Sequence, residues 1–297
     1  MSGRVVIAGG SGFIGRALSD ALIEAGFTTA ILSRRGAGAL QWDGATPGVW
    51  VTQLNGAVGV INLTGEPIAT KWTHQKQQEI INSRVNSTNA IGNAILAVEK
   101  PPKVWINGSA VGFYGDRGDE ILTEDSAPGA MDNFLVSTCV AWEEAQSKFE
   151  TPNTRQCCLR TGVVLGKDGG AFPELKKLAN LFLGGKAGSG NQYMPWIHLE
   201  DIVGLFLFAL KNELTGPING TAPEPVTNEK FMSTLRESVG KKFGLNAPVF
   251  SMRLASALGA TDPDVILCSQ RAIPKKAMDA GYEFRFPTLA AAIEDLR

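Results

Sequence analysis

The sequence predicts an α/β protein in which a parallel sheet carries helices on both of its faces. Three observations support this prediction. Short β-branched runs alternate with amphipathic segments, the first such run leads into a glycine-rich turn, and a helical segment follows that turn directly. The chain has 297 residues, of which 44% are apolar and 19% charged, which is typical of a globular protein with a large core.

The opening segment VVIAGGSGFIG is the most informative part of the chain. Gly9 suits a turn conformation that a Cβ disfavours, Gly12 lets the backbone approach a diphosphate, and Gly15 lets the helix pack closely on the strand. The helix starts around Phe13 and Ile14, whose N–H groups are expected to point at the same diphosphate. A strand, this turn and a helix predict dinucleotide binding on a Rossmann-type sheet, and the lack of a following GK[ST] disfavours a mononucleotide P-loop.

Further strand and helix signals continue this alternation along the chain. Gly26 stands where a helix C-terminus is expected, and Pro101 and Pro102 stop a long helix. Strands are expected at residues 4–8, 28–33, 40–42, 58–63, 104–107, 155–159 and 217–220. Helices are expected at residues 14–25, 73–98, 134–148 and 201–210.

After the sixth strand the alternation weakens, which predicts a second, smaller unit. We expect a dinucleotide-binding domain at residues 1–165, to which residues 196–222 return. Residues 166–195 and 223–297 then form a mostly helical lobe on the substrate side.

Charge and composition exclude several classes of protein. A net charge of -1 without a basic stripe gives no electrostatic basis for binding nucleic acid. No apolar run reaches the roughly 18 residues of a membrane span, and the first strand leaves no room for a signal peptide, so we expect a cytoplasmic protein. The four cysteines lack C-x-x-C spacing, which predicts buried thiols, and no ligand cluster predicts a metal.

The end of the second strand predicts which dinucleotide binds. NAD-binding sheets of this type place an acidic residue there, whereas this strand ends in Ser33, Arg34 and Arg35. An arginine can bond a 2′-phosphate, so we expect NADP, held by Arg34 with Ser33 assisting. The alternative is that these arginines are solvated surface cations.

Other residues are expected near the same edge of the sheet. Asn62, Leu63 and Thr64 end the fourth strand, where open parallel sheets bind their ligands. Arg160 ends the sixth strand at the same level and would meet pyrophosphate or substrate. Glu79 and Arg84 on the long helix either reach the adenosine or lie on a solvent-exposed helix face.

Four segments resemble those of a known family in their order along the chain. They are GGSGFIG, NLTGEP, GSAVGFYGD and PWIHLEDIVG, and the sequence is similar to the extended short-chain dehydrogenase/reductases, the NAD-dependent epimerase/dehydratase group. The similarity extends to an epimerase-like subgroup through WTHQ, INSR, TRQCCLRTGVVLG and QRAIPKKAMDAGYEF, and so covers nearly the whole chain. It implies a Rossmann core that binds NADP(H), a C-terminal lobe over the substrate cleft and a possible homodimer, but no particular substrate.

The resemblance also implies a catalytic arrangement, which this chain matches only in part. Members of the family carry a serine or threonine after the fifth strand and a Tyr-x-x-x-Lys on the next helix. Ser109 matches the first position. With Trp142 and Glu143 as the register, Leu135 and Cys139 stand at the tyrosine and lysine positions, so neither the phenol nor the cation is present.

Several side chains could replace the missing acid. Tyr114 is the nearest phenol, and it is either an acid or a packed turn aromatic. Asp116 and Glu66 are other proton carriers near the sheet edge. His198 is either catalytic or a hydrogen-bonded structural residue, whereas His74 is expected at a helix start.

Two functional hypotheses follow. The first is an NADP(H)-dependent oxidoreductase or epimerase-like enzyme that acts on a small carbonyl or sugar-like substrate, with Ser109 polarising the substrate oxygen. The second is an NADP(H)-binding sensor or regulatory protein without turnover, which the residues at positions 135 and 139 favour.

Overall fold

The computed structural model describes residues 3–35 and 38–297 of the chain. The main sheet is built from β1 (Arg4–Ala8), β2 (Thr28–Ser33), β3 (Leu40–Gln41), β4 (Gly59–Asn62), β5 (Val104–Ala110), β7 (Arg155–Thr161) and β12 (Gly216–Gly220). All seven strands are parallel, in the order β12-β7-β5-β4-β1-β2-β3. This confirms the predicted α/β fold with a Rossmann-type sheet.

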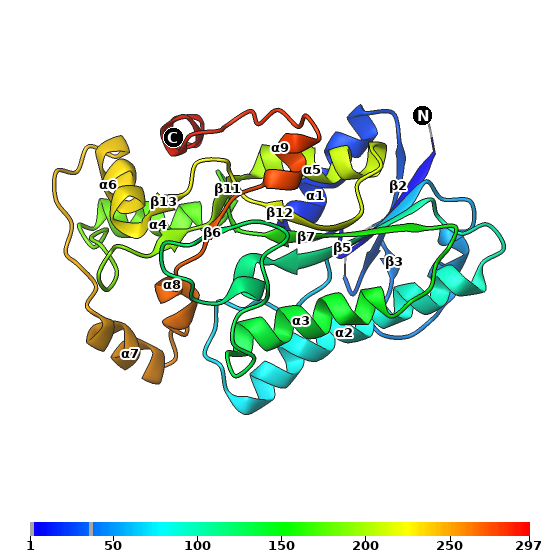
Figure 1. Ribbon diagram of the computed structural model, residues 1–297, viewed down its shortest axis with the longest axis horizontal. Helices are drawn as coiled ribbons and strands as arrows, with labels where there is room; N and C mark the ends of the chain where they lie inside the picture. Colours follow the sequence, from blue (N-terminus) through cyan, green and yellow to red (C-terminus); the bar gives the residue numbers. More distant parts are fainter. Residues whose placement is uncertain (1–2, 36–37) are drawn as a thin grey trace.

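Helices cover both faces of the sheet. Figure 1 shows α2 (His74–Ala97) and α3 (Phe134–Ser147) side by side along one face, with α1 (Phe13–Glu24) and α5 (Leu199–Lys211) on the other. Side chains at the helix starts fix where α2 and α3 begin. The Thr73 hydroxyl accepts a hydrogen bond from the Lys76 N–H, and the Asn133 side chain accepts from two N–H groups of α3. The short 3₁₀ helices η1 (Val49–Leu54) and η2 (Val111–Tyr114) lie in connecting segments.

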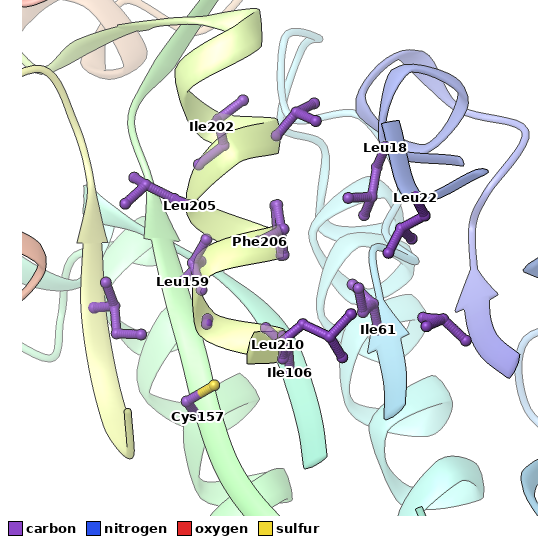
Figure 2. Packing of buried hydrophobic residues seen from close by; sticks show 14 of the residues in the cluster. Leu18, Leu22, Ile61, Ile106, Cys157, Leu159, Ile202, Leu205, Phe206 and Leu210 are labelled. Carbon is purple, nitrogen blue, oxygen red and sulfur yellow. The ribbon is translucent and has the colours of Figure 1, made fainter. Parts of the chain in front are cut away.

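The two sides of the sheet hold separate hydrophobic cores. Val5 and Ile7 of β1 belong to the core beneath α1 and α5, whereas Val6 and Ala8 belong to the core beneath α2 and η1. Successive side chains of a strand point to opposite faces, so a strand buried on both sides is apolar throughout. Figure 2 shows the first core, where side chains of α1 and α5 meet those of β4, β5 and β7.

The rest of the chain packs beside the sheet as a smaller unit with its own core. Its apolar side chains include Leu165, Phe172, Trp196 and Phe231. Its short strands are β8 (Val163–Gly166), β9 (Gly169–Gly170), β10 (Tyr193–Met194), β11 (Trp196–His198) and β13 (Val226–Thr227), with a further pair in β6 (Ile121–Leu122) and β14 (Arg271–Ala272). Helices α4 (Phe172–Asn180), α6 (Asn228–Ser238) and α10 (Leu289–Asp295) pack around this core. The remaining helices are α7 (Val249–Ala257), α8 (Asp264–Leu267) and α9 (Lys275–Asp279), of which α9 packs against β12 of the main sheet.

The strand order places a crevice at the carboxyl edge of the sheet. The chain moves from β1 to β2 on one side, while β4 pairs with β1 on the other. The Gly9 N–H donates to the Leu32 carbonyl at 2.9 Å, and the Leu63 N–H donates to the Ala8 carbonyl at 2.8 Å. The ends of β1, β2 and β4 therefore lie together at the point of reversal, where sheets of this type bind their ligands.

Within the described residues, we find no helix that is both long and apolar enough to span a bilayer.

Candidate cofactor site and the neighbouring polar cluster

The glycine turn between β1 and α1 leaves no room for side chains. Gly9 has a φ of 76°, and a Cβ there would lie 2.9 Å from the Leu63 carbonyl carbon. A Cβ on Gly15 would lie 2.6 Å from the Gly9 carbonyl oxygen, and one on Gly12 would lie 3.2 Å from it. The glycines thus keep the turn tight and its backbone accessible, which is the geometry a bound diphosphate needs.

The N-terminus of α1 is open to an anion. Gly12 is its N-cap residue, no side chain of the described chain caps it, and its first turn has no acidic residue. The first N–H groups of the helix, including those of Phe13 and Ile14, are therefore available together with the positive end of the helix dipole. The Phe13 ring itself packs against the glycines of the β8–β9 hairpin, and Ile14 packs against the core, so only their backbone faces the turn.

Three adjoining cavities surround the end of β2, and Arg34 lines all of them. The one over the glycine turn is about 180 Å³ and includes Gly9, Gly12 and Thr64. A second, of about 430 Å³, lies toward Trp42 and Trp50. The third, of about 460 Å³, is lined by Ser11, Ser33, Arg34, Arg35 and Glu66.

Ser33 and Arg34 both line these cavities. Their backbone lies at the end of β2, where it was expected from the sequence. The Ser33 hydroxyl lies 2.6 Å from that of Ser11 and also contacts the Arg35 carbonyl. The Arg34 side chain is 68% exposed, and its Nη1 lies 2.9 Å from a carboxylate oxygen of Glu66. Arg34 is thus exposed at the end of β2 and already has an anionic partner.

The residues that end β4 divide into those that face the cavity and one that holds the turn. Asn62 is fully buried; its amide nitrogen donates to Asn107 Oδ1 at 2.8 Å, and its oxygen accepts from the Thr64 N–H. Leu63 and Thr64 line the cavity over the glycines. The Thr64 hydroxyl is buried without a hydrogen-bond partner among the residues the structure describes, which fits a site that takes a polar ligand.

Glu79 and Arg84 differ in what they can reach. Glu79 is exposed, bonds Lys76 and Gln75, and lines none of the cavities described above. Arg84 points from α2 toward the end of β4. Its Nη1 donates to the Glu66 carbonyl at 3.0 Å, and its guanidinium lies over the Trp142 ring, 4.9 Å from the centroid.

Ser109, Glu143 and Arg160 form a buried cluster next to this edge. Ser109 on β5 pairs with Arg160 on β7, and both reach Glu143 on α3. The Ser109 hydroxyl donates to Glu143 Oε1 at 2.6 Å, while Arg160 donates to both carboxylate oxygens, at 2.8 and 2.9 Å. A functional role for Glu143 was not expected from the sequence, although an acid one helical turn, four residues, beyond the lysine position could have indicated one.

The structure corrects the expectation that Arg160 meets pyrophosphate or substrate. Its side chain is 4% exposed, its Nε and Nη2 bond Glu143, and its Nη1 lies 3.0 Å from the Tyr114 hydroxyl. The Phe113 ring covers the guanidinium at 3.5 Å from its centroid. All its donor groups are directed at protein atoms, because the paired carboxylate and the two aromatic rings lie inside the fold.

Tyr114 is likewise placed as a packed aromatic. It is fully buried, and its hydroxyl lies 2.7 Å from Asn219 Oδ1. Burial raises the pKa of Tyr114 to about 12, against the opposing effect of the Arg160 cation. A phenol in this setting is inaccessible to a substrate and holds its proton at neutral pH.

Helix α3, on which the family resemblance places the catalytic tyrosine and lysine, offers no replacement for the missing acid. Leu135 and Cys139 lie on α3, and burial raises the pKa of the Cys139 thiol to about 12. His198 is buried and caps α5, its Nδ1 accepting from the Glu200 N–H at 3.2 Å, which is the structural role considered for it. The Asp116 carboxylate binds the Gly118 and Ser269 N–H groups, and His74 opens α2 as expected. No group of metal-ligating side chains occurs in residues 3–35 and 38–297.

The fold and this site together define a Rossmann-type α/β protein with an uncapped glycine turn and an arginine at the end of its second strand. Residues 5–221 match the model of the NAD dependent epimerase/dehydratase family, and residues 247–296 match a domain of unknown function, DUF1731. The chain belongs to the NAD-dependent epimerase/dehydratase family.

Relatives in other organisms are similar over almost their full length. The human epimerase family protein SDR39U1 is 35% identical over 298 residues, which cover 99% of each chain. The Bacillus subtilis epimerase family protein YfhF is 34% identical and covers 98% of this chain and 97% of its own. A crystal structure of human SDR39U1 (isoform 2) with NADPH superposes with a TM-score of 0.90 at 32% identity and covers 99% of this chain and 98% of that one.

Proposed function

We propose that this protein binds NADP(H) with its diphosphate at the N-terminus of α1 and its adenosine 2′-phosphate at Arg34. The observation that carries the proposal is that Gly12, at the uncapped N-terminus of α1, and Arg34 line the same cavity. The human relative that was crystallised with NADPH supports the same choice. The residues in this region fit the group, because Gly9, Gly12 and Gly15 place no Cβ atom at the points of close backbone approach and no acid stands at the end of β2.

We further propose that the protein is an oxidoreductase or epimerase-like enzyme for a small carbonyl or sugar-like substrate. When bound, NADP(H) would donate or accept a hydride. Ser109 is the side chain of this chain that we assign to the substrate oxygen. The Ser109 side chain is buried and donates its own proton to Glu143, so its hydroxyl oxygen is suited only to accept a hydrogen bond from a substrate hydroxyl that reaches it.

The second candidate function is an NADP(H)-binding sensor without turnover. A specific observation favours it: α3 presents Leu135 and a buried thiol where the family carries its acid and cation. In that case binding would be kept and the hydride would not be transferred.

The cofactor assignment is tested by calorimetry of the full chain with NADPH and NADH. We expect Arg34→Glu to weaken NADPH at least tenfold and NADH by less than threefold, because only NADPH places a phosphate beside position 34. Arg253→Glu is the matched control, since Arg253 is exposed on α7 and the charge change is the same. An equal loss for both nucleotides would show that Arg34 does not bind the 2′-phosphate.

The two candidate functions are separated by turnover. NADPH consumption with panels of carbonyl compounds and nucleotide sugars, and NADP+ reduction with the corresponding alcohols, are followed at 340 nm. Activity that falls in Ser109→Ala while NADPH affinity is kept supports the enzyme. Tight NADPH binding with no turnover in either direction supports the sensor.

A further inference from the structure

Glu66 stands beside Arg34 although it comes from the opposite side of the crevice. It follows β4, and its backbone is fixed to α2 at both ends of the residue. The Glu66 N–H donates to the Ser83 hydroxyl at 2.9 Å, and its carbonyl accepts from Arg84 at 3.0 Å. The position of its backbone is therefore set by the fold, and its side chain starts from the edge of the crevice that faces Arg34.

The carboxylate binds two cations. One oxygen lies 2.9 Å from Arg34 Nη1, and the other lies 3.2 Å from Lys76 Nζ. The hydrogen bond from Lys76, with a further contribution from Arg34, holds the pKa of Glu66 below its usual value despite partial burial. Glu66 is therefore ionised at neutral pH and keeps Arg34 paired.

The same carboxylate lines the cavity that the proposed function gives to the 2′-phosphate. That cavity is bounded by Ser11, Ser33, Arg34, Arg35 and Glu66. A phosphate monoester carries a charge of about −1.5 to −2 at pH 7 and seeks the same guanidinium donors. Two anions then depend on one arginine, and like charges placed side by side repel.

We propose that Glu66 competes with the 2′-phosphate for Arg34 and thereby limits the preference of this protein for NADP over NAD. The inference rests on the proposed function, because it needs the phosphate to bind at Arg34. Binding of a 2′-phosphate has to weaken or break the Arg34–Glu66 pair, and Lys76 then remains as the partner of the carboxylate. An adenosine without this phosphate leaves the pair in place.

The inference is tested by calorimetry of the full chain with two fragments of the cofactor, adenosine 2′,5′-bisphosphate and 5′-AMP. An exposed ion pair changes an equilibrium constant about twofold to fivefold, and removal of a neighbouring like charge adds to this. We expect Glu66→Gln to tighten the bisphosphate about threefold to tenfold and to leave 5′-AMP within about twofold. Glu24→Gln, an exposed residue at the end of α1, is the matched control and should change neither.

A second variant shows whether the effect passes through Arg34. In an Arg34→Ala background, Glu66→Gln should tighten binding of the bisphosphate less than twofold, because the guanidinium for which Glu66 and the phosphate compete is absent. A gain of the same size in both backgrounds would mean that Glu66 acts by general repulsion, and the inference would be wrong. Unchanged or weaker binding of the bisphosphate by Glu66→Gln alone would also overturn it.

The failure of the proposed function looks different. If the wild-type chain binds neither fragment nor NADPH, the cofactor assignment itself is wrong. If the wild-type chain binds the bisphosphate more tightly than 5′-AMP and Glu66→Gln makes no difference, the assignment stands and only the role of Glu66 is refuted.

Discussion

Replacing Glu143 by glutamine hardly changes the shape of the side chain but should destabilise this protein substantially. Glu143 holds Arg160 through two charged hydrogen bonds and also accepts from Ser109. Glutamine keeps one oxygen acceptor and loses the negative charge. Arg160, which is 4% exposed, would then be a buried cation whose remaining neighbours are an aromatic ring, a hydroxyl and a distant carbonyl.

The expected magnitude follows from the burial of the pair. Removing one partner of a buried ion pair costs about 3–5 kcal/mol, because the other charge remains without its counter-ion. One retained acceptor reduces this to about 2–4 kcal/mol. With a urea m-value of about 3 kcal/mol/M for a chain of this size, the unfolding midpoint should fall by roughly 1 M.

Urea unfolding followed by circular dichroism measures the effect, with Glu120→Gln as the control. Glu120 pairs with Arg117 at 2.7 Å but is 50% exposed, so its removal should cost less than about 1 kcal/mol. The double variant Glu143→Met with Arg160→Met should lose less stability than the sum of its parts, because it strands no charge. If Glu143→Gln shifts the midpoint no more than Glu120→Gln, the pair contributes nothing beyond a surface contact, and the reasoning is refuted.

Two further predictions concern buried titratable groups. Burial lowers the pKa of His198, so just below pH 6.5 the unfolded chain binds more protons than the folded one, and the melting temperature should fall as the pH drops through that range. His198→Asn keeps a hydrogen-bond acceptor at the N-cap of α5 and should make this fall less steep; an equally steep fall in the variant would contradict the prediction. The native protein should react slowly with a thiol reagent at pH 7.5, because burial raises the pKa of all four cysteines, Cys139, Cys157, Cys158 and Cys268, to about 11 at the least buried one, Cys268. All four thiols should react in the unfolded chain, and rapid labelling of more than one thiol in the native protein would contradict their burial in the structure.

The parallel sheet was predictable because its central strands β1, β4 and β5 are buried on both faces and are connected through the helices α1, α2 and α3, whose ends are recognisable. Strands β1, β4 and β5 and helices α1, α2 and α3 lie within a few residues of their expected bounds. The short strands β8 to β11 were not predicted, since segments of two to four residues carry no usable periodicity. The expected homodimer and the cytoplasmic compartment stay predictions.

The error at Arg160 shows where reasoning from the chain alone stops. The sequence places its backbone correctly at the end of β7, but the direction of its side chain depends on Glu143, which precedes it by 17 residues and comes from α3. Sequence spacing does not show how a helix is rotated above a sheet, so an arginine that is internally paired looks the same as one that waits for a ligand. The pair of Arg34 and Glu66 could not be predicted for the same reason. It joins two loops across the crevice that lie 32 residues apart in the sequence.

The hydrogen-bond direction at Ser109 limits the chemistry that this site can perform. With its proton donated to Glu143, the buried Ser109 hydroxyl can only accept a further hydrogen bond, whereas polarising a carbonyl requires a donor. The side chains at positions 135 and 139 and the buried phenol of Tyr114 give no proton at neutral pH. A substrate hydroxyl that reached Ser109 would donate to its oxygen, while the Ser109 hydroxyl kept its 2.6 Å hydrogen bond to Glu143. We therefore expect this arrangement to suit a substrate that arrives as an alcohol better than one that arrives as a carbonyl. That Ser109 polarises a carbonyl oxygen stays a prediction, which the turnover of Ser109→Ala with carbonyl compounds would test.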